Sequence, residues 1–185
     1  MTEKAKYVVG IDLGTTHSAL AHASLEREAR VEVMPIAQLV ASGVVESRPL
    51  LPSFVYFAHE SEGAQALPWD AQRKFAVGEY ARSRGVEAPA RLVSSAKSWL
   101  SHGGIDRRAP TLPVGAPEDV EKISPVEASW RLLEHVSEAW AATMSLPLAE
   151  QEVVLTVPAS FDAAARDLTV EAAVAAGFEH LTLLE

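Results

Sequence analysis

Apolar and polar residues at the start of the chain follow the patterns that β-strands produce. Residues 7–11 are almost continuously apolar, which predicts a strand that is buried on both faces. The turn signal Gly14-Thr15-Thr16 follows, and residues 18–25 continue as a second strand before a polar turn at 26–28. Because the gap between the two strands is too short for a crossover helix, we expect them to pair antiparallel.

The pattern becomes less regular after this first pair of strands. Residues 30–34 alternate as a third strand, which Pro35 ends. Residues 53–57 form a further predicted strand, and residues 90–100 form a predicted helix. Residues 103–125 carry several prolines and charges, so we predict a surface loop there.

The segment from Ser124 to Pro147 carries the clearest helical pattern. Ser124 is a good N-cap, Pro125 suits the first helical position, and Glu127 completes a capping box three residues after the cap. Apolar residues then recur at spacings of three and four, which places on one face of the helix Val126, Trp130, Leu133, Val136, Trp140 and Met144. We therefore expect both tryptophans to pack in the core.

The end of the chain is typical of a strand–helix–strand unit. Residues 153–157 form a buried strand, and Asp162 caps an alanine-rich helix over 163–176 that Gly177 stops. Residues 181–184 form another short strand. The fold class is therefore α/β, with a mixed sheet of three antiparallel strands followed by strand–helix–strand.

Composition narrows the classes of partner and compartment. The chain has 185 residues and is 48% hydrophobic, enough for a folded domain. Its 16 basic against 25 acidic residues give a net charge of −9, which argues against general binding to nucleic acid or to an anionic membrane. The chain has no cysteine, so disulfides and thiolate sites are excluded. With no signal-peptide pattern at its start, we expect a cytoplasmic protein.

The segment from Asp12 to Ser18 is the one that indicates chemistry. A carboxylate at the end of a buried strand is followed at once by the Gly14-Thr15-Thr16 turn. Glycine permits a close backbone approach, and the N–H groups of such a turn can converge on phosphate oxygens. The carboxylate can hold Mg²⁺ through bound water. An ordinary hairpin turn with a capping aspartate is the alternative on these residues alone.

Several motifs together resemble a known family. Residues 9–16 with Ser18 are similar to the first phosphate motif of the actin-like ATPase superfamily, especially of the seventy-kilodalton heat-shock chaperones, and sugar kinases share a similar turn. Residues 154–162 resemble the chaperones' strand and Val-Pro-Ala-x-Phe turn. Further segments fall where that family has its following helix, its Thr-Pro-Ser strand start and its Val-Gly segment, namely Arg166 with 175–177, residues 48–53 and residues 77–79.

The resemblance implies a fold and a division of the chain. The fold is the first lobe of an actin-like, ribonuclease H-like ATPase domain. Residues 1–48 and 122–185 are then its sheet subdomain, and residues 49–121 are a smaller inserted α/β subdomain. The second lobe and the peptide-binding domain of the family lie outside this sequence, which we interpret as a piece of a longer protein.

The resemblance also assigns roles to residues of the first turn. It implies that Asp12 orients a hydrated Mg²⁺ and that Gly14, Thr15 and Thr16 contact the β- and γ-phosphates of ATP or ADP. Thr16 is further implied to position the attacking water. His17 stands where the family usually has asparagine, beside the phosphates, and is included among the nucleotide-binding residues.

More distant residues receive roles in the same way. Lys97 falls where the family has a lysine that reaches the γ-phosphate, so it joins Asp12 and Thr16 as a catalytic candidate. Pro158 and Arg166 match residues that signal the nucleotide state to the partner domain. Glu185 falls one position short of the family's acidic residue and is given no catalytic role.

The expected function is therefore that of a chaperone's ATPase lobe. In the full-length protein, ATP hydrolysis would be coupled to binding of unfolded polypeptides, with co-chaperones as further partners. The lobe by itself is expected to bind nucleotide weakly and to self-associate through its exposed interlobe face. Two alternatives are a carbohydrate kinase, which the turn over 157–161 argues against, and a polymerising actin-like protein, which the insert over 49–121 disfavours.

Overall fold

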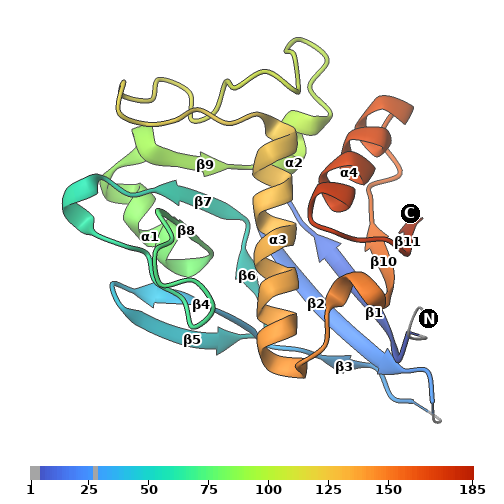
Figure 1. Cartoon of the computed structure of the whole chain (residues 1–185). Helices are drawn as coiled ribbons and strands as arrows, with labels where there is room; N and C mark the ends of the chain where they lie inside the picture. The colour runs from blue at the N-terminus through green and yellow to red at the C-terminus, as the bar shows by residue number, and fades with distance from the viewer. Residues whose placement is uncertain (1–4, 27–28) are drawn as a thin grey trace.

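The chain folds around a main sheet with the strand order β11-β10-β1-β2-β3, and a short strand, β6, pairs with the start of β2 (Figure 1). The computed structural model describes residues 5–26 and 29–185. The strands of this sheet are β1 (Tyr7–Leu13), β2 (His17–Ser24), β3 (Glu32–Val33), β6 (Leu51–Pro52), β10 (Glu152–Thr156) and β11 (Leu181–Leu184).

The pairing directions confirm the predicted fold class. β2 pairs antiparallel with both β1 and β3, while β10 runs parallel to β1 and to β11. The third predicted strand, over 30–34, is reduced to the two residues of β3. The predicted turn at 26–28 falls largely outside the described residues.

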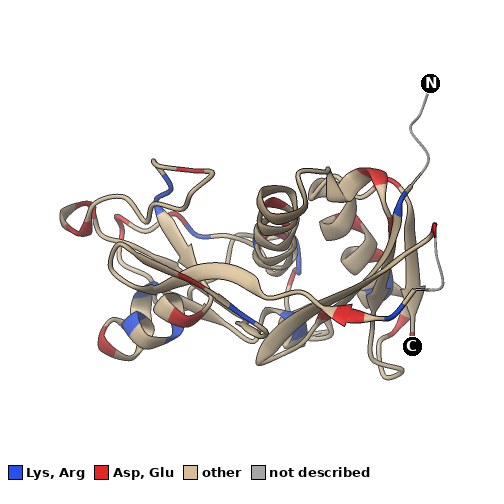
Figure 2. Cartoon of the chain, turned by 90° about the horizontal axis from the view of Figure 1, so that it is seen from below, with Lys and Arg blue, Asp and Glu red and all other residues tan. Residues whose placement is uncertain are grey.

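Two helices cover one face of the main sheet, and this corrects the expected burial of β1. Helices α3 (Pro125–Met144) and α4 (Ala163–Ala175) lie on the same side (Figure 2). Val9 and Ile11 point into that core and are fully buried, whereas Val8 and Gly10 on the other face are only half-buried. β1 is therefore buried on one face and not on both.

The self-association expected of this lobe stays a prediction.

The middle of the chain forms two small sheets beside the main sheet (Figure 1). It contains a hairpin of β4 (Ile36–Ala41) with β5 (Val44–Arg48), and a sheet of β7 (Phe54–Phe57), β8 (Phe75–Val77) and β9 (Leu92–Ser94), with α1 (Glu79–Glu87) packed against it. Short 3-10 turns span Glu60–Glu62 and Pro89–Arg91 in this region and Leu148–Glu150 after α3. Leu39 of the hairpin shares a small core with Tyr56 and Ala81. The subdomain bounds of 49 and 121 stay a prediction.

The predicted helix over 90–100 is wrong for most of its length. Residues 89–91 form a 3-10 turn, residues 92–94 form β9, and only the last part is helical as α2 (Ala96–Leu100). β9 pairs antiparallel with β7, placing Val93 opposite Val55. The backbone hydrogen bonds of this distant pairing outweigh the local helical tendency.

Helix α3 begins where the sequence predicts, at Ser124. The Ser124 hydroxyl accepts a hydrogen bond from the Glu127 amide at 3.0 Å. The Glu127 carboxylate accepts from Arg131 at 2.7 Å instead of returning to the cap, so half of the predicted capping box forms. Trp140 is fully buried in the main core and Trp130 packs at its edge, which confirms the expected packing of both. Among the described residues, no helix has the length and hydropathy that crossing a bilayer requires.

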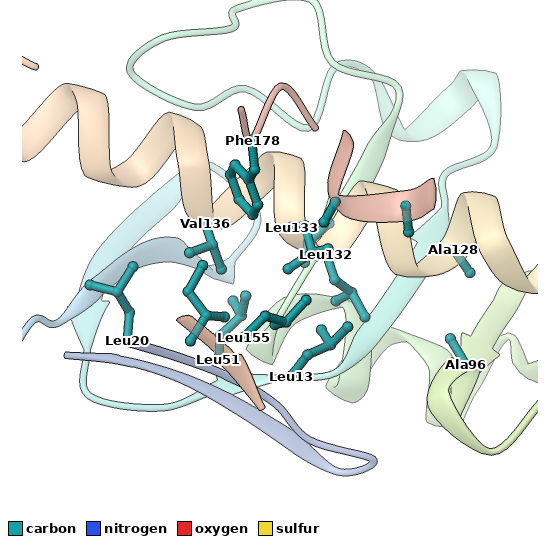
Figure 3. Packing of buried hydrophobic residues seen from close by; sticks show 14 of the residues in the cluster. Leu13, Leu20, Leu51, Ala96, Ala128, Leu132, Leu133, Val136, Leu155 and Phe178 are labelled. Atoms are coloured by element: carbon teal, nitrogen blue, oxygen red, sulfur yellow. The ribbon is translucent and has the colours of Figure 1, made fainter. Parts of the chain in front are cut away.

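Helix α4 is thin, as its alanine content predicts, and it packs closely on the core. Asp162 caps it by accepting from the Ala165 amide at 2.7 Å, and Gly177 after its end has a φ of +89°. Ala165, Ala172 and other small residues of α4 are fully buried. Figure 3 shows the cluster between sheet and helices, with side chains of β1, β2, β10 and α3 pointing toward one another.

A buried polar cluster joins α3 to the middle of the chain. The Arg73 guanidinium, almost fully buried, pairs with Glu138 of α3 and lies 3.5 Å from His135 Nδ1. The other His135 nitrogen, Nε2, lies 2.9 Å from the Ala37 carbonyl oxygen and donates to it. Burial, reinforced by the nearby Arg73, lowers the pKa of His135 to about 3. His135 is therefore neutral, and Trp69 completes the cluster with a 3.0 Å hydrogen bond to Glu138.

Candidate functional site

The predicted phosphate turn lies between β1 and β2 and faces solvent. Thr15, Thr16 and His17 are all exposed. Gly14 has an ordinary φ, so its backbone conformation does not require glycine. Glycine is required because a side chain at this position would have no space. A Cβ on Gly14 would lie well inside 3.0 Å of the His17 carbonyl oxygen, closer than real Cβ contacts. The turn is thus as tight as the Gly-Thr-Thr pattern predicts.

Ser53 supports this turn through two hydrogen bonds, a role that the sequence motifs did not reveal. Its hydroxyl donates to the Gly14 carbonyl at 2.8 Å, and its amide donates to the Thr16 carbonyl at 2.9 Å. The hydroxyl also lies 3.0 Å from that of Ser18. Ser53 is buried and directly follows β6, which pairs with β2. The segment 48–53 that resembles the family's Thr-Pro-Ser strand start therefore supports the phosphate turn.

Asp12 stands at the end of β1 with its side chain exposed. Parallel pairing places Thr156 of β10 directly opposite it. The Thr156 hydroxyl donates to Asp12 Oδ1 at 2.8 Å, which orients the carboxylate. The sequence did not single out Thr156, since its register against Asp12 depends on strands far apart in the chain.

Lys97 projects from α2 toward the same end of the sheet. Its Nζ lies 6.0 Å from the centre of the Phe161 ring, within the range of a cation–π contact. Burial lowers the pKa of Lys97, and the negative charge of Asp12 partly offsets that effect. Lys97 is half-buried, and it lies close enough to Asp12 for the two opposite charges to interact.

Pro158 lies on the turn between β10 and α4, and Arg166 lies in the first turn of α4. Arg166 Nε donates to the Phe161 carbonyl at 3.1 Å, and the Phe161 amide donates to the Pro158 carbonyl at 3.0 Å. The Arg166 guanidinium also pairs with Glu185 just after β11. Phe161 therefore contacts Arg166 through its backbone and Lys97 through its ring.

The Val-Gly segment over residues 77–79 matters through its backbone, because Gly78 adopts a conformation and a close packing that suit glycine. Gly78 has a φ of +95°, and a Cβ there would lie 2.7 Å from Leu51 Cδ1. The buried Gln38 side chain accepts from the Glu79 amide at 3.0 Å and donates to the Leu50 carbonyl at 3.0 Å. Gly78 thus lets α1 begin close against β4 and β6.

Surface pockets of about 420 and 480 Å³ lie apart from this site. The first is formed by residues 103–108 with the start of α4, and the second by the end of β7 with residues 119–121. None of the predicted site residues lines either pocket. The phosphate turn is an open surface on this chain.

Comparison with known proteins agrees with the motifs. The family model described as Hsp70 protein matches residues 8–185. The chaperone protein HscA of Enterobacter sp. (strain 638) is 32% identical over 191 residues, covering 97% of this chain and 27% of that protein. The HscA homolog of Methylococcus capsulatus is 34% identical, covering 97% and 26%, and the chaperone protein DnaK of Thermotoga maritima is 30% identical, covering 100% and 25%.

The chain therefore spans about a quarter of the length of the curated relatives it matches. The family match runs from the second residue of β1 to the last residue and includes both the phosphate turn and the Val-Pro-Ala-x-Phe turn. It confirms the resemblance drawn from the motifs. The chain belongs to the Hsp70 family.

Proposed function

We propose that this chain is the phosphate-binding half of a chaperone's ATPase domain and that it holds the phosphates of ATP or ADP with Mg²⁺. The observation that carries this proposal is that Asp12 ends β1 directly before the tight, exposed Gly14-Thr16 turn, with Lys97 near enough for its charge to interact with that of Asp12. Backbone N–H groups of a tight turn and a lysine ammonium both favour phosphate oxygens. A plain hairpin turn would need neither Lys97 nor the bracing by Ser53.

The donor set fits Mg²⁺ bound chiefly through water and phosphate. Among the described residues, no group of three or more His, Asp or Glu side chains could hold a metal. Asp12 supplies a single exposed carboxylate, oriented by Thr156. Mg²⁺ dehydrates reluctantly and is commonly held by one or two carboxylates, waters and substrate phosphates. When bound, the ion would neutralise charge on the phosphates.

The remaining residues of the site have separate roles in phosphate binding and hydrolysis. The Thr15 and Thr16 amides and hydroxyls contact the β- and γ-phosphates, with Thr16 also positioning the attacking water. His17, exposed at the start of β2, adds a donor beside them. Lys97 stabilises negative charge on the transferred phosphoryl group. Its partial burial strengthens this interaction, because fewer water molecules screen the ammonium.

At the level of the longer protein, we propose that ATP hydrolysis is coupled to polypeptide binding and is tuned by co-chaperones. Pro158 and Arg166 would carry the signal, since Phe161 links the Arg166 contact to Lys97. The match to the Hsp70 family model argues against the carbohydrate kinase and the polymerising actin-like protein.

The phosphate site is tested by calorimetric titration of this chain with Mg·ADP and Mg·ATP. We expect weak binding that Asp12→Asn weakens further. Glu152→Gln is the matched control, because Glu152 is an exposed carboxylate on the same face of the sheet at the opposite end of β10. Equal affinity in Asp12→Asn, or no heat at any nucleotide concentration, would contradict the proposal.

The coupling is tested in a longer chain that contains both lobes and the peptide-binding domain. Arg166→Ala should leave nucleotide affinity nearly unchanged and reduce the effect of ATP on peptide release. A peptide-release rate that responds fully to ATP in Arg166→Ala would contradict the signalling role.

A further inference from the structure

The turn that leads into α2 has an unusual backbone. Ser95 has a φ of 55° and a ψ of 34°, in the left-handed region that crowds the Cβ of every residue except glycine. A residue before a helix normally has an extended backbone and caps the helix with its side chain. Ser95 does neither, since its side chain makes no capping hydrogen bond among the described residues. Its carbonyl oxygen accepts from the Ser98 amide at 2.9 Å.

The course of this turn decides where the sides of α2 point. Ala96 and Leu100, one helical turn apart, are 2% and 0% exposed and anchor the helix in the main core (Figure 3 labels Ala96). Lys97 comes one residue after Ala96, so its side chain leaves the helix about 100° further round. That direction brings Lys97 Nζ over the Phe161 ring. A five-residue helix with two anchors depends on its entering turn for its orientation.

We propose that Ser95 is a positioning residue for Lys97, because its left-handed backbone orients α2 so that the lysine lies over Phe161 while Ala96 stays buried. The inference rests on the function proposed for Lys97. Strained backbone conformations persist only where the surrounding structure holds them, and they cluster at functional sites. What matters at this position is the backbone conformation and not the hydroxyl group.

Ser145 offers a matched control elsewhere in the chain. It has nearly the same backbone, with a φ of 55° and a ψ of 30°, but it ends α3 and is exposed. A β-branched valine is poorly compatible with the left-handed region at either serine. Both Ser95→Val and Ser145→Val should therefore lower the denaturation midpoint, and only the first should move Lys97.

The experiment measures the position of Lys97 without nucleotide. NMR spectra of the nucleotide-free chain with ¹³C-labelled lysine, assigned with Lys97→Arg, report nuclear Overhauser effects between the Lys97 side chain and the Phe161 ring. We expect these in the native chain, in Ser95→Gly and in Ser145→Val. We expect their loss in Ser95→Val.

Two results would overturn the inference: retention of the Lys97–Phe161 signals in Ser95→Val, or their loss in Ser95→Gly. Glycine accepts the left-handed backbone without a hydroxyl, so Ser95→Gly remains decisive even where Ser95→Val does not fold. Because no nucleotide is needed, this result is separate from failure of the calorimetric test. Where binding is measurable, Ser95→Val should weaken it as Lys97→Gln does, and a double variant weaker than Lys97→Gln alone would also contradict the inference.

Discussion

Gly14→Ala is the substitution whose effect follows most directly from the structure of the site. The added Cβ would lie well inside 3.0 Å of the His17 backbone oxygen, so the turn must open. Opening the turn breaks the two hydrogen bonds that Ser53 donates to the Gly14 and Thr16 carbonyls, at 2.8 and 2.9 Å. Overpacking costs about 1–3 kcal/mol, and each lost hydrogen bond costs about 1 kcal/mol. The smaller unfolded-state entropy of alanine offsets roughly 0.4–1 kcal/mol.

We therefore expect Gly14→Ala to lower the free energy of unfolding by about 2–4 kcal/mol. For a domain of this size each kcal/mol shifts the melting temperature by roughly 2–4 °C. Urea denaturation followed by circular dichroism measures the loss of unfolding free energy. Calorimetric titration with Mg·ADP measures the effect on nucleotide binding at the phosphate turn. Gly103→Ala is the control, because Gly103 has an ordinary φ and the added methyl group would meet no atom of the described residues within 4 Å. If Gly14→Ala were as stable as the Gly103→Ala control, the steric reasoning would be refuted.

Three other predictions concern the framework around the site. Trp140→Ala should cost about 3–5 kcal/mol in urea unfolding, since Trp140 is fully buried. Trp140→Phe should cost much less, because the indole N–H is buried without a hydrogen-bond partner among the described residues, and equal losses for the two variants would contradict this. Ser124→Ala should cost about 1 kcal/mol through loss of the α3 cap, and an unchanged urea midpoint would count against it. His135 binds its proton more weakly in the folded chain, where its pKa is about 3, than in the unfolded chain, where it is near 6.5. Its contribution to stability is thus complete above pH 6.5 and is lost as the pH falls from there toward 3, by up to about 1.4 kcal/mol per pH unit. Urea midpoints at about pH 7.5 and 4.5 should differ less in His135→Gln than in the native chain, and an equal difference would refute the assignment.

Local sequence signals predicted the helices that begin with a capping residue. Ser124 caps α3 and Asp162 caps α4, as their positions before helical patterns predict. The same approach failed where a partner far away in the sequence determines the secondary structure. Residues 92–94 join β7 as a strand because β7 offers backbone hydrogen bonds that no neighbour in sequence supplies. The hairpin of β4 and β5 was likewise missed, and its Leu39 is buried in a small core that includes Tyr56 and Ala81 from distant parts of the chain.

The family and the phosphate turn of the candidate site could be predicted without any structure. Asp12 and the Gly14-Thr16 turn are contiguous, so a short motif carries both the carboxylate and the tight backbone. The residues that support this carboxylate and this turn could not be predicted in the same way. Thr156 reaches Asp12 through the parallel register of β1 and β10, and Ser53 reaches the turn through β6. The physical reason is that a turn forms from neighbouring residues, whereas its supports come from strands and helices that long-range packing brings together.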